Sequence, residues 1–234
     1  MIRAYLYLAA FIPMTFIFSI SAIISTLFDS TGRLYAWHAR LWGQLGLAMN
    51  GITVTLTGAE YLPDGPVIFM SNHQSNFDIL SLLAAIPRQI HWIAKKELFE
   101  IPVFGPSMRR GGYIPLDRGD GRKALQSMDE AAATIHQGKS VVLFPEGTRS
   151  TDGNLLPFKR GGFILARKAD VPVIPVTING SGRINPANQI RLYSGDIHIT
   201  LHPPIAVPSG LRRSDAESWM MENVHKQIES TLEH

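Results

Sequence analysis

The sequence contains no cysteine among its 234 residues, which excludes disulfides, thiolate metal sites and cysteine nucleophiles. It also lacks zinc-finger spacing, the signature of an RNA-recognition motif and any long run of lysine or arginine, so we expect no nucleic-acid partner. No serine stands on a Gly-x-Ser-x-Gly turn; GPSMR, around Ser107, comes nearest but lacks the final glycine. The chain therefore offers no covalent nucleophile of the usual kinds.

Charge is missing from the amino-terminal segment. Residues 4–28 carry no charged side chain, with Arg3 before them and Asp29 after them. A helix of this length rises about 37 Å, more than the ~30 Å apolar core of a bilayer, and Pro13 would kink it. A secretory signal fits poorly, because strong hydrophobicity continues beyond the small residues of SISAIIS.

The following segment, GRLYAWHARLWGQLGLAMNG, mixes Trp, Tyr and Arg with leucine, which is typical of a membrane interface. We therefore expect residues 1–50 to form membrane-anchoring helices. Three arrangements remain open at this point: a helix that spans the bilayer, a kinked helical pair that enters one leaflet, or a helix buried in a soluble protein. Basic residues flank both sides, so charge does not set the orientation.

From residue 51 onward, strands and helices are expected to alternate. Short apolar or alternating runs predict strands at ITVTLTG, VIFM, QIHWIA, SVVLF and VPVIPVTI, and another near a sheet edge at DIHITLHPPI. Helices are predicted at FDILSLLAAI, GRKALQSMDEAAATIHQG and GGFILARKAD. The order predicts an α/β domain over residues 51–234, with a mostly parallel mixed sheet flanked by helices. The last helix is expected to begin at Ser214, with Glu217 completing a capping box.

The stretch SNHQSNFDIL places His73 and Asp78 directly after an expected strand. On a continuous helix these residues would lie about 140° apart, so they converge only if the chain turns between them. Asn76 is the expected N-cap of the next helix, which puts Asp78 in its first turn. A carboxylate there can hold one ring nitrogen of His73 and leave the other free to act as a base. The alternative is that both residues merely cap a loop and a helix; without a third ligand they predict no metal site.

Cationic side chains follow several of the expected strands. Lys95 and Lys96 come after HWIA, Arg118 after GGYIPLD, and Arg149 lies in FPEGTRS. Since the carboxyl ends of parallel strands meet at one edge of a sheet, we expect these cations and His73 to share a crevice. The net charge of +3 and a pI near 9.3 likewise favour an anionic partner.

Taken together, NHQSNFD and FPEGTRS resemble the glycerolipid acyltransferase family. Four blocks of that family occur in its order across residues 72–176: NHQSNFD, then KKELFEIPVFGPSMRRGGYIPLDR, then FPEGTRS followed by LPFKRGG, and finally VPVIPV. The similarity extends over about residues 51–207 and leaves the amino-terminal segment outside it.

The resemblance implies a glycerolipid acyltransferase-like fold and transfer of an acyl chain to the sn-2 hydroxyl of 1-acyl-glycerol-3-phosphate, giving phosphatidic acid. It implies His73 as the general base and Asp78 as the residue that orients it, with no metal, no cofactor and no covalent acyl-enzyme. Acyl-CoA or acyl carrier protein is the implied co-substrate. The implied substrate-binding residues are Lys95, Arg118, Glu146, Gly147, Thr148 and Arg149, and the choice between Lys95 and Lys96 remains open.

The implied partners are lysophosphatidic acid, the acyl thioester and a membrane bilayer. We expect a bacterial inner membrane with the catalytic domain facing the cytoplasm, where soluble thioester donors reside. Three alternatives keep the same residues: a different lyso-lipid acceptor (a lysophospholipid or a lyso-aminolipid), a thioester or ester hydrolase in which His73 activates water, and a membrane-bound lipid-binding protein without turnover.

Overall fold

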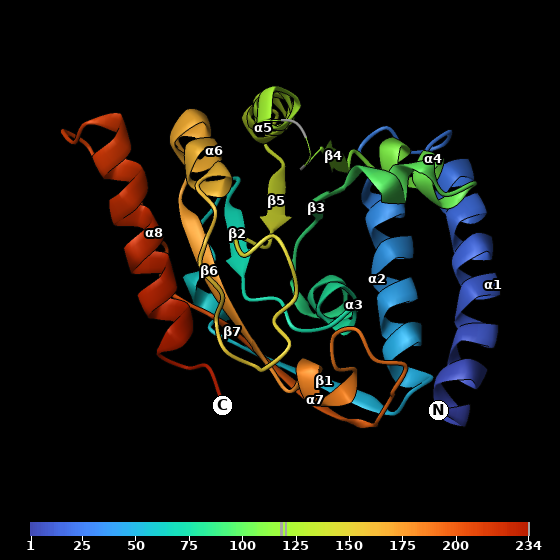
Figure 1. The fold of residues 1–234 in the computed structure, drawn as a ribbon. Coiled ribbons are helices and arrows are strands. Elements are labelled where there is room, and N and C mark those ends of the chain that lie inside the picture. Colours follow the sequence, from blue (N-terminus) through green and yellow to red (C-terminus); the bar gives the residue numbers. More distant parts are fainter. Residues whose placement is uncertain (118, 120, 234) are drawn as a thin grey trace.

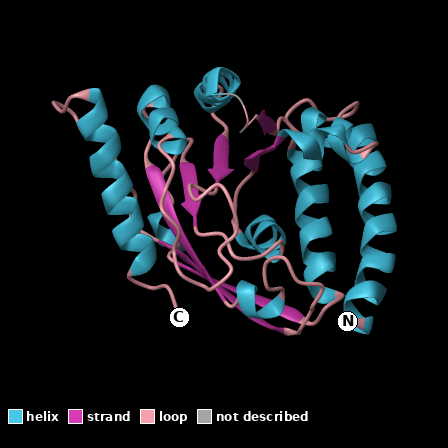
Figure 2. Ribbon diagram, in the orientation of Figure 1, coloured by secondary structure: helices cyan, strands magenta, loops and turns pink. Residues whose placement is uncertain are grey.

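The computed structural model describes residues 1–117, 119 and 121–233, except the side chains of residues 122, 124 and 125. Helices surround a central group of strands (Figures 1 and 2). The elements in chain order are α1 (Ile2–Ser25), α2 (Arg33–Ala48), β1 (Ile52–Thr57), η1 (Ala59–Tyr61), β2 (Ile68–Ser71), α3 (Phe77–Ala85), β3 (Ile90–Lys95), η2 (Lys96–Glu100), α4 (Phe104–Arg110), β4 (Ile114–Leu116), α5 (Gly121–His136), β5 (Ser140–Leu143), α6 (Gly161–Ala169), β6 (Val173–Asn179), α7 (Ser181–Ile184), β7 (Gly195–Leu201) and α8 (Arg213–Glu229).

The strands of the described residues form one seven-stranded sheet in the order β1-β7-β6-β2-β5-β3-β4. Neighbouring strands run parallel, except that β6 and β7 are antiparallel. The predicted α/β fold with a mostly parallel mixed sheet is confirmed. The strand expected near an edge, β7, lies one position inside it, because β1 pairs with β7 from Ile52↔Gly195 to Thr57↔Thr200.

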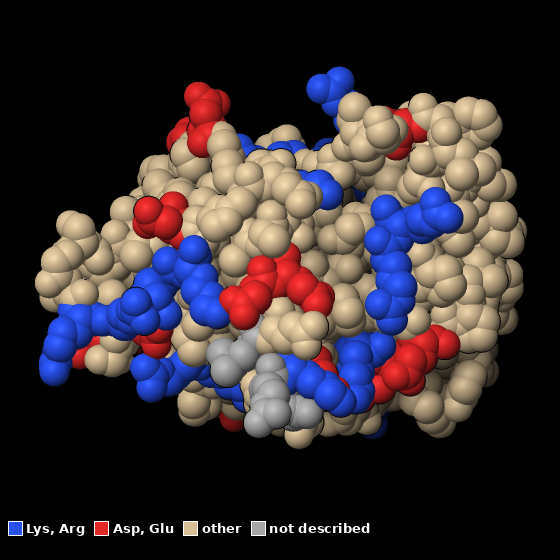
Figure 3. Space-filling view, turned by 90° about the horizontal axis from the view of Figure 1, so that it is seen from above, with Lys and Arg blue, Asp and Glu red and all other residues tan. Residues whose placement is uncertain are grey.

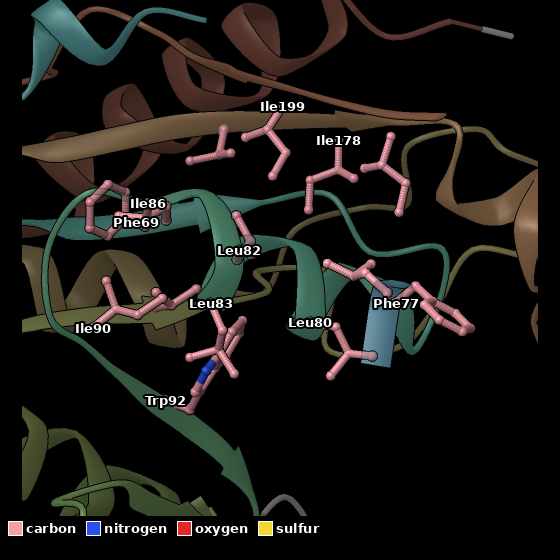
Figure 4. Close-up of a cluster of buried hydrophobic side chains, with 14 of the residues drawn as sticks. Phe69, Phe77, Leu80, Leu82, Leu83, Ile86, Ile90, Trp92, Ile178 and Ile199 are labelled. Atoms are coloured by element: carbon pink, nitrogen blue, oxygen red, sulfur yellow. The ribbon is translucent and has the colours of Figure 1, made fainter. Parts of the chain in front are cut away.

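Both faces of the central strands are buried. In β2, Phe69 packs in the apolar cluster on the α3 side, while Ile68 and Met70 pack in the cluster formed with α5, α6 and α8. Figure 4 shows the first cluster, where side chains of α3 meet those of the sheet. Burial on both faces explains why these strands appear in the sequence as continuous apolar runs.

At the amino terminus, α1 and α2 form a helical hairpin (Figure 1). Two side-chain hydrogen bonds join the helices: Trp42 Nε1 donates to Thr15 Oγ1 at 2.9 Å, and Ser21 Oγ lies 2.9 Å from His38 Nε2. Pro13 lies inside α1 without ending it.

The outer surface of α1 is apolar and exposed. Ile2 is 79% exposed, Leu6 67% and Ile17 65%. Only 17% of its most apolar 18-residue window is buried, so the arrangement as a core helix of a soluble protein is wrong. Within the described part of the chain, α1 is the one helix whose length and composition suit a bilayer crossing. Seen from above (Figure 3), the outermost surface on the α1 side shows no charged residues.

The expected capping box at the start of α8 is wrong. Ser214 Oγ donates to Asp215 Oδ1 instead of accepting a helix N–H group. Glu217 is 5% exposed and accepts hydrogen bonds from Arg160 Nη2 and Arg167 Nε, both at 2.9 Å. Two charge-assisted hydrogen bonds, from the N-cap residue of α6 and from the helix itself, are stronger than a single neutral cap, so the carboxylate turns toward them.

A close approach between α2 and α3 determines where the hairpin lies. A Cβ atom at Gly43 would stand 2.8 Å from the backbone oxygen of Leu80, which is too short for any side chain. Since α3 carries Asp78, this glycine brings the apolar hairpin next to the segment that holds the candidate base.

We expect Gly43→Ala to lower the free energy of unfolding. Overpacking against a backbone oxygen costs about 1–3 kcal/mol, and alanine's better helix propensity offsets at most about 1 kcal/mol of that. Thermal unfolding in detergent measures the change, with Gln44→Ala on the exposed side of α2 as the control. A Gly43→Ala variant as stable as Gln44→Ala would contradict the close approach.

Candidate active site

His73 and Asp78 are brought together by a turn between β2 and α3. His73 Nδ1 lies 2.7 Å from Asp78 Oδ2, and the same oxygen accepts the backbone N–H groups of Gln74 at 2.8 Å and Ser75 at 2.9 Å. The Asp78 side chain is fully buried, whereas 14% of the His73 side chain is exposed. Because Oδ2 accepts, Nδ1 carries the hydrogen and Nε2 keeps its lone pair. Among the described residues, Nε2 has no hydrogen-bond partner.

Asn76 is the N-cap residue of α3, as predicted, and the helix begins at Phe77. Its side chain, however, makes no capping hydrogen bond. The Oγ atom of Ser75 accepts the N–H group of Phe77 at 3.2 Å, and Asn76 Oδ1 instead accepts a hydrogen bond from Arg149 Nη1 at 3.0 Å. A guanidinium donor makes a stronger bond than a neutral backbone amide, so the amide oxygen points to Arg149.

A second loop, residues 144–150, holds the backbone of His73 on both sides. Glu146 Oε1 accepts the His73 N–H group at 2.7 Å, and the Ser150 N–H group donates to the His73 carbonyl at 2.8 Å. The ring of Phe144 stacks on the imidazole with centroids 3.8 Å apart and an interplanar angle of 6°. The loop follows β5, which lies next to β2 in the sheet, so neighbouring strand ends supply both halves of the site.

Glu146 connects its own loop to two other segments through hydrogen bonds to the backbone of His73 and of Leu156. Besides the His73 N–H group, it accepts the N–H group of Leu156 at 2.9 Å through Oε2, and the residue is 2% exposed. Burial raises the pKa of Glu146 to about 7, against the lowering effect of the two backbone hydrogen bonds and with a further increase from the nearby Asp78 charge. Glu146 therefore supports the backbone of His73 and does not itself line the cavity in front of the His73 side chain.

Gly147 and Thr148 complete this loop. Gly147 adopts a φ of 72°, which favours glycine, and a Cβ atom there would lie 3.0 Å from the Nζ atom of Lys159. Thr148 is exposed and lines the cavity in front of His73.

The predicted cations occupy different positions around this cavity. Arg149 and Lys95 both line it, and Arg149 is half-buried. The Lys95 side chain is 57% exposed, and its Nζ atom lies 3.5 Å from Glu97 Oε1. Lys96 Nζ instead lies 2.7 Å from Asp117 Oδ2. Of the two lysines, Lys95 therefore faces the site. Arg118 lies outside the described residues.

The cavity in front of His73 has a volume of about 600 Å³. Its walls are mostly apolar. They come from β3 (Trp92), from the end of β5 (Phe144), from α4 (Met108) and from the hairpin (Phe18, Trp42). The candidate base His73 and the cations Lys95 and Arg149 thus line a cavity whose other walls are mostly apolar, which fits a substrate with an anionic head and a long apolar part. Among the described residues, no three His, Asp or Glu side chains are arranged to hold a metal ion.

Comparison with known proteins assigns the family. A family model described as "Acyltransferase" matches residues 53–179, more than half of the chain and the part that contains His73, Asp78 and Arg149. The chain belongs to the acyltransferase family.

Named relatives of this acyltransferase share one description. It is 39% identical over 183 residues to the chloroplastic 1-acyl-sn-glycerol-3-phosphate acyltransferase of Brassica napus, an alignment that covers 76% of this chain and 53% of that protein. It is 36% identical over 159 residues to 1-acyl-sn-glycerol-3-phosphate acyltransferase alpha of Homo sapiens, covering 67% of this chain and 56% of the human protein. The chain thus spans about half the length of these curated relatives.

A solved structure agrees over nearly the whole fold. The crystal structure of the 1-acyl-sn-glycerophosphate acyltransferase of Thermotoga maritima matches this acyltransferase with a TM-score of 0.81 and 26% sequence identity. The match covers 98% of this chain and 96% of the other, so it includes the α1–α2 hairpin as well as the sheet.

Sequence reasoning missed three residues that shape the site of this acyltransferase. Phe144 and Ser150 are the first and last residues of the FPEGTRS motif. Nothing in the local sequence indicates that Phe144 stacks on His73 or that Ser150 binds the His73 carbonyl. The side chain of Asn72 accepts from Ile178 N at 2.7 Å and donates to Ile178 O at 2.9 Å, which ties the His73 loop to β6. An amide directly after a strand is the only signal for this role.

The pKa of Glu146 predicts a pH-dependent stability. The folded protein keeps this proton up to about pH 7, while an unfolded glutamate releases it near 4.5, so the group favours folding most below pH 4.5 and progressively less up to about pH 7. We expect wild type to lose about 3 kcal/mol of unfolding free energy from this group over that window. Glu146→Gln should flatten the pH profile in chemical denaturation, whereas the exposed control Glu60→Gln should keep it. An unchanged profile in Glu146→Gln would contradict the assignment.

Proposed function

We propose that this acyltransferase transfers an acyl chain from a thioester to the sn-2 hydroxyl of 1-acyl-sn-glycerol-3-phosphate, giving phosphatidic acid. The observation that carries the proposal is the His73–Asp78 pair, 2.7 Å apart, at a cavity that Arg149 also lines. The names of the relatives and of the solved neighbour support the same acceptor.

The reaction requires a base but no enzyme nucleophile. His73 Nε2 takes the proton from the acceptor hydroxyl as its oxygen attacks the thioester carbonyl carbon. Asp78 holds Nδ1–H and stabilises the imidazolium that forms. When the carbon–sulfur bond breaks, the imidazolium returns the proton to the leaving thiolate, so His73 is neutral again and no acyl-enzyme forms.

The acceptor's phosphate binds to the cations at the cavity mouth. Arg149 offers a planar fork suited to phosphate oxygens, and Lys95 adds a second positive charge on the same cavity. We assign Arg118 to the same phosphate from its place in the family motif. Thr148 lies at the rim, while Gly147 and Glu146 shape the loop that presents Arg149.

The donor is a thioester of coenzyme A or of acyl carrier protein, and no further cofactor is needed. Both donors are acidic, which suits a protein of net charge +3. The acceptor is a lipid, and the exposed apolar surface of α1 supports a position of the cavity next to a bilayer. We propose the cytoplasmic face of a bacterial inner membrane, since both thioester donors are soluble there.

We expect His73→Ala to lower kcat for acyl transfer to lysophosphatidate by about 10²–10⁴-fold, which is the usual contribution of a general base. His198→Ala, an exposed histidine on β7, is the matched control and should retain activity. The assay uses purified protein, an acyl-CoA or acyl carrier protein donor and several lyso-lipid acceptors. Abundant transfer by His73→Ala would remove the proposed base, and donor cleavage independent of any acceptor would indicate a hydrolase.

Arg149→Ala should raise the KM for lysophosphatidate by about 10–100-fold, because one charge-assisted hydrogen bond contributes about 1.5–3 kcal/mol. The KM of a phosphate-free lyso-aminolipid acceptor should not change. Arg183→Ala removes an exposed arginine that pairs with Glu233 and serves as the control. Equal effects of Arg149→Ala on both acceptors would argue against phosphate recognition at this residue.

A further inference from the structure

A second apolar cavity, of about 630 Å³, lies beside the one that contains His73. It is bounded by α1, by the start of α3 and by the loop of residues 185–192. Neither His73 nor Asp78 lines it. The two cavities share one wall, made of Thr15, Trp42, Asn76, Ile79, Phe104 and Arg149.

Two contacts hold residues of the shared wall together. Trp42 Nε1 donates to Thr15 Oγ1 at 2.9 Å, and the rings of Trp42 and Phe104 lie 6.4 Å apart. Beyond the shared wall, each cavity has apolar lining of its own: Trp92, Phe144 and Met108 line only the first, and Phe77, Leu80 and Leu192 line only the second.

The proposed reaction involves two acyl chains, one on the donor and one already on the acceptor. The donor's carbonyl carbon must reach the hydroxyl held at His73, so its chain belongs in the cavity that His73 lines. The acceptor's own chain leaves the glycerol next to the reacting hydroxyl, close to the phosphate bound by Arg149. Arg149 lines the second cavity and His73 does not, which suits a chain that leaves the acceptor near its phosphate.

The charged residues that line the second cavity and its opening along α1 also suit the acceptor's chain. Among the described residues, the lining of the second cavity includes Arg149 and Arg191 but no Asp or Glu, which suits a lipid with an anionic head. Leu8 and Ile12 line this cavity and are 41% and 50% exposed, so it opens along α1. A lipid chain can therefore enter sideways from the bilayer, while a soluble donor approaches from water.

We infer that the second cavity is the binding site for the acyl chain that the acceptor already carries, while the cavity at His73 takes the chain being transferred. This inference rests on the proposed function, because it assumes that the acceptor is a lysolipid. It adds a separate subsite on α1, α3 and the 185–192 loop, so that chain preferences for acceptor and donor are set by different residues.

Photolabelling tests the inference by binding alone. A lysophosphatidate with a diazirine at the tip of its acyl chain is bound to the full chain in vesicles and irradiated, and the labelled residues are mapped by mass spectrometry. We expect label on Phe77, Leu80 and Leu192, which line the second cavity and are 4%, 5% and 8% exposed, too buried to react from the bilayer. Label on Tyr35 and Met108, deep in the first cavity, or on the lipid-facing surface of α1 alone, would overturn it.

Kinetics provide a second, independent readout. We expect Leu8→Trp to narrow the second cavity and raise the KM of an oleoyl acceptor by about tenfold, because each methylene excluded from apolar contact costs about fourfold. A hexanoyl acceptor and the donor chain-length profile should not change. Leu6→Trp, which is 67% exposed and lines neither cavity, is the control.

An equal rise in KM for the oleoyl and hexanoyl acceptors in Leu8→Trp would overturn the assignment, and so would a changed chain-length preference for the donor. The proposed function fails by a different result, the absence of transfer to lysophosphatidate by wild type. The photolabel still distinguishes the two cavities in that case, since it requires no turnover.

Discussion

One buried carboxylate oxygen organises the candidate active site. Asp78 Oδ2 accepts three hydrogen bonds, from the ring of His73 and from the N–H groups of Gln74 and Ser75. The backbone bonds turn the chain sharply between β2 and α3, and the ring bond fixes which imidazole nitrogen can accept a proton. Because the Asp78 side chain is fully buried, water does not compete for these bonds. Without this oxygen the His73 ring would lose the contact that fixes its orientation and its tautomer.

The base also depends on a strand that is distant in sequence. Glu146, 73 residues away, binds the N–H group of His73, and Ser150 binds its carbonyl. These contacts exist because β5 pairs in parallel with β2, which brings the loops after both strands to the same end of the sheet. The sheet thus supplies a rigid support, and the chemistry lies in the loops that it presents.

The second feature of the site is its position between two environments. Residues at the carboxyl ends of the strands, His73, Lys95 and Arg149, line the first cavity, and the α1–α2 hairpin supplies apolar walls to both cavities. The glycine contact between α2 and α3 lets the hairpin lie close enough to close them. The reaction that we propose, between a soluble thioester and a membrane lipid, needs such a boundary, because one reactant approaches from water and the other from hydrocarbon.

The sequence by itself determined the α/β class, the main strands and the apolar amino-terminal helix, and it put His73 and Asp78 on either side of an expected turn. These features are local: burial on both faces makes apolar runs, and a strand end followed by a helix start makes the turn. Only the tertiary structure decided which donor each polar side chain meets. Asn76 turned to Arg149 and Glu217 to Arg160 and Arg167, because a charged donor from a distant element competes better than a neutral backbone amide nearby. The two cavities were likewise beyond the sequence, since their walls combine helices and loops whose proximity no local pattern encodes.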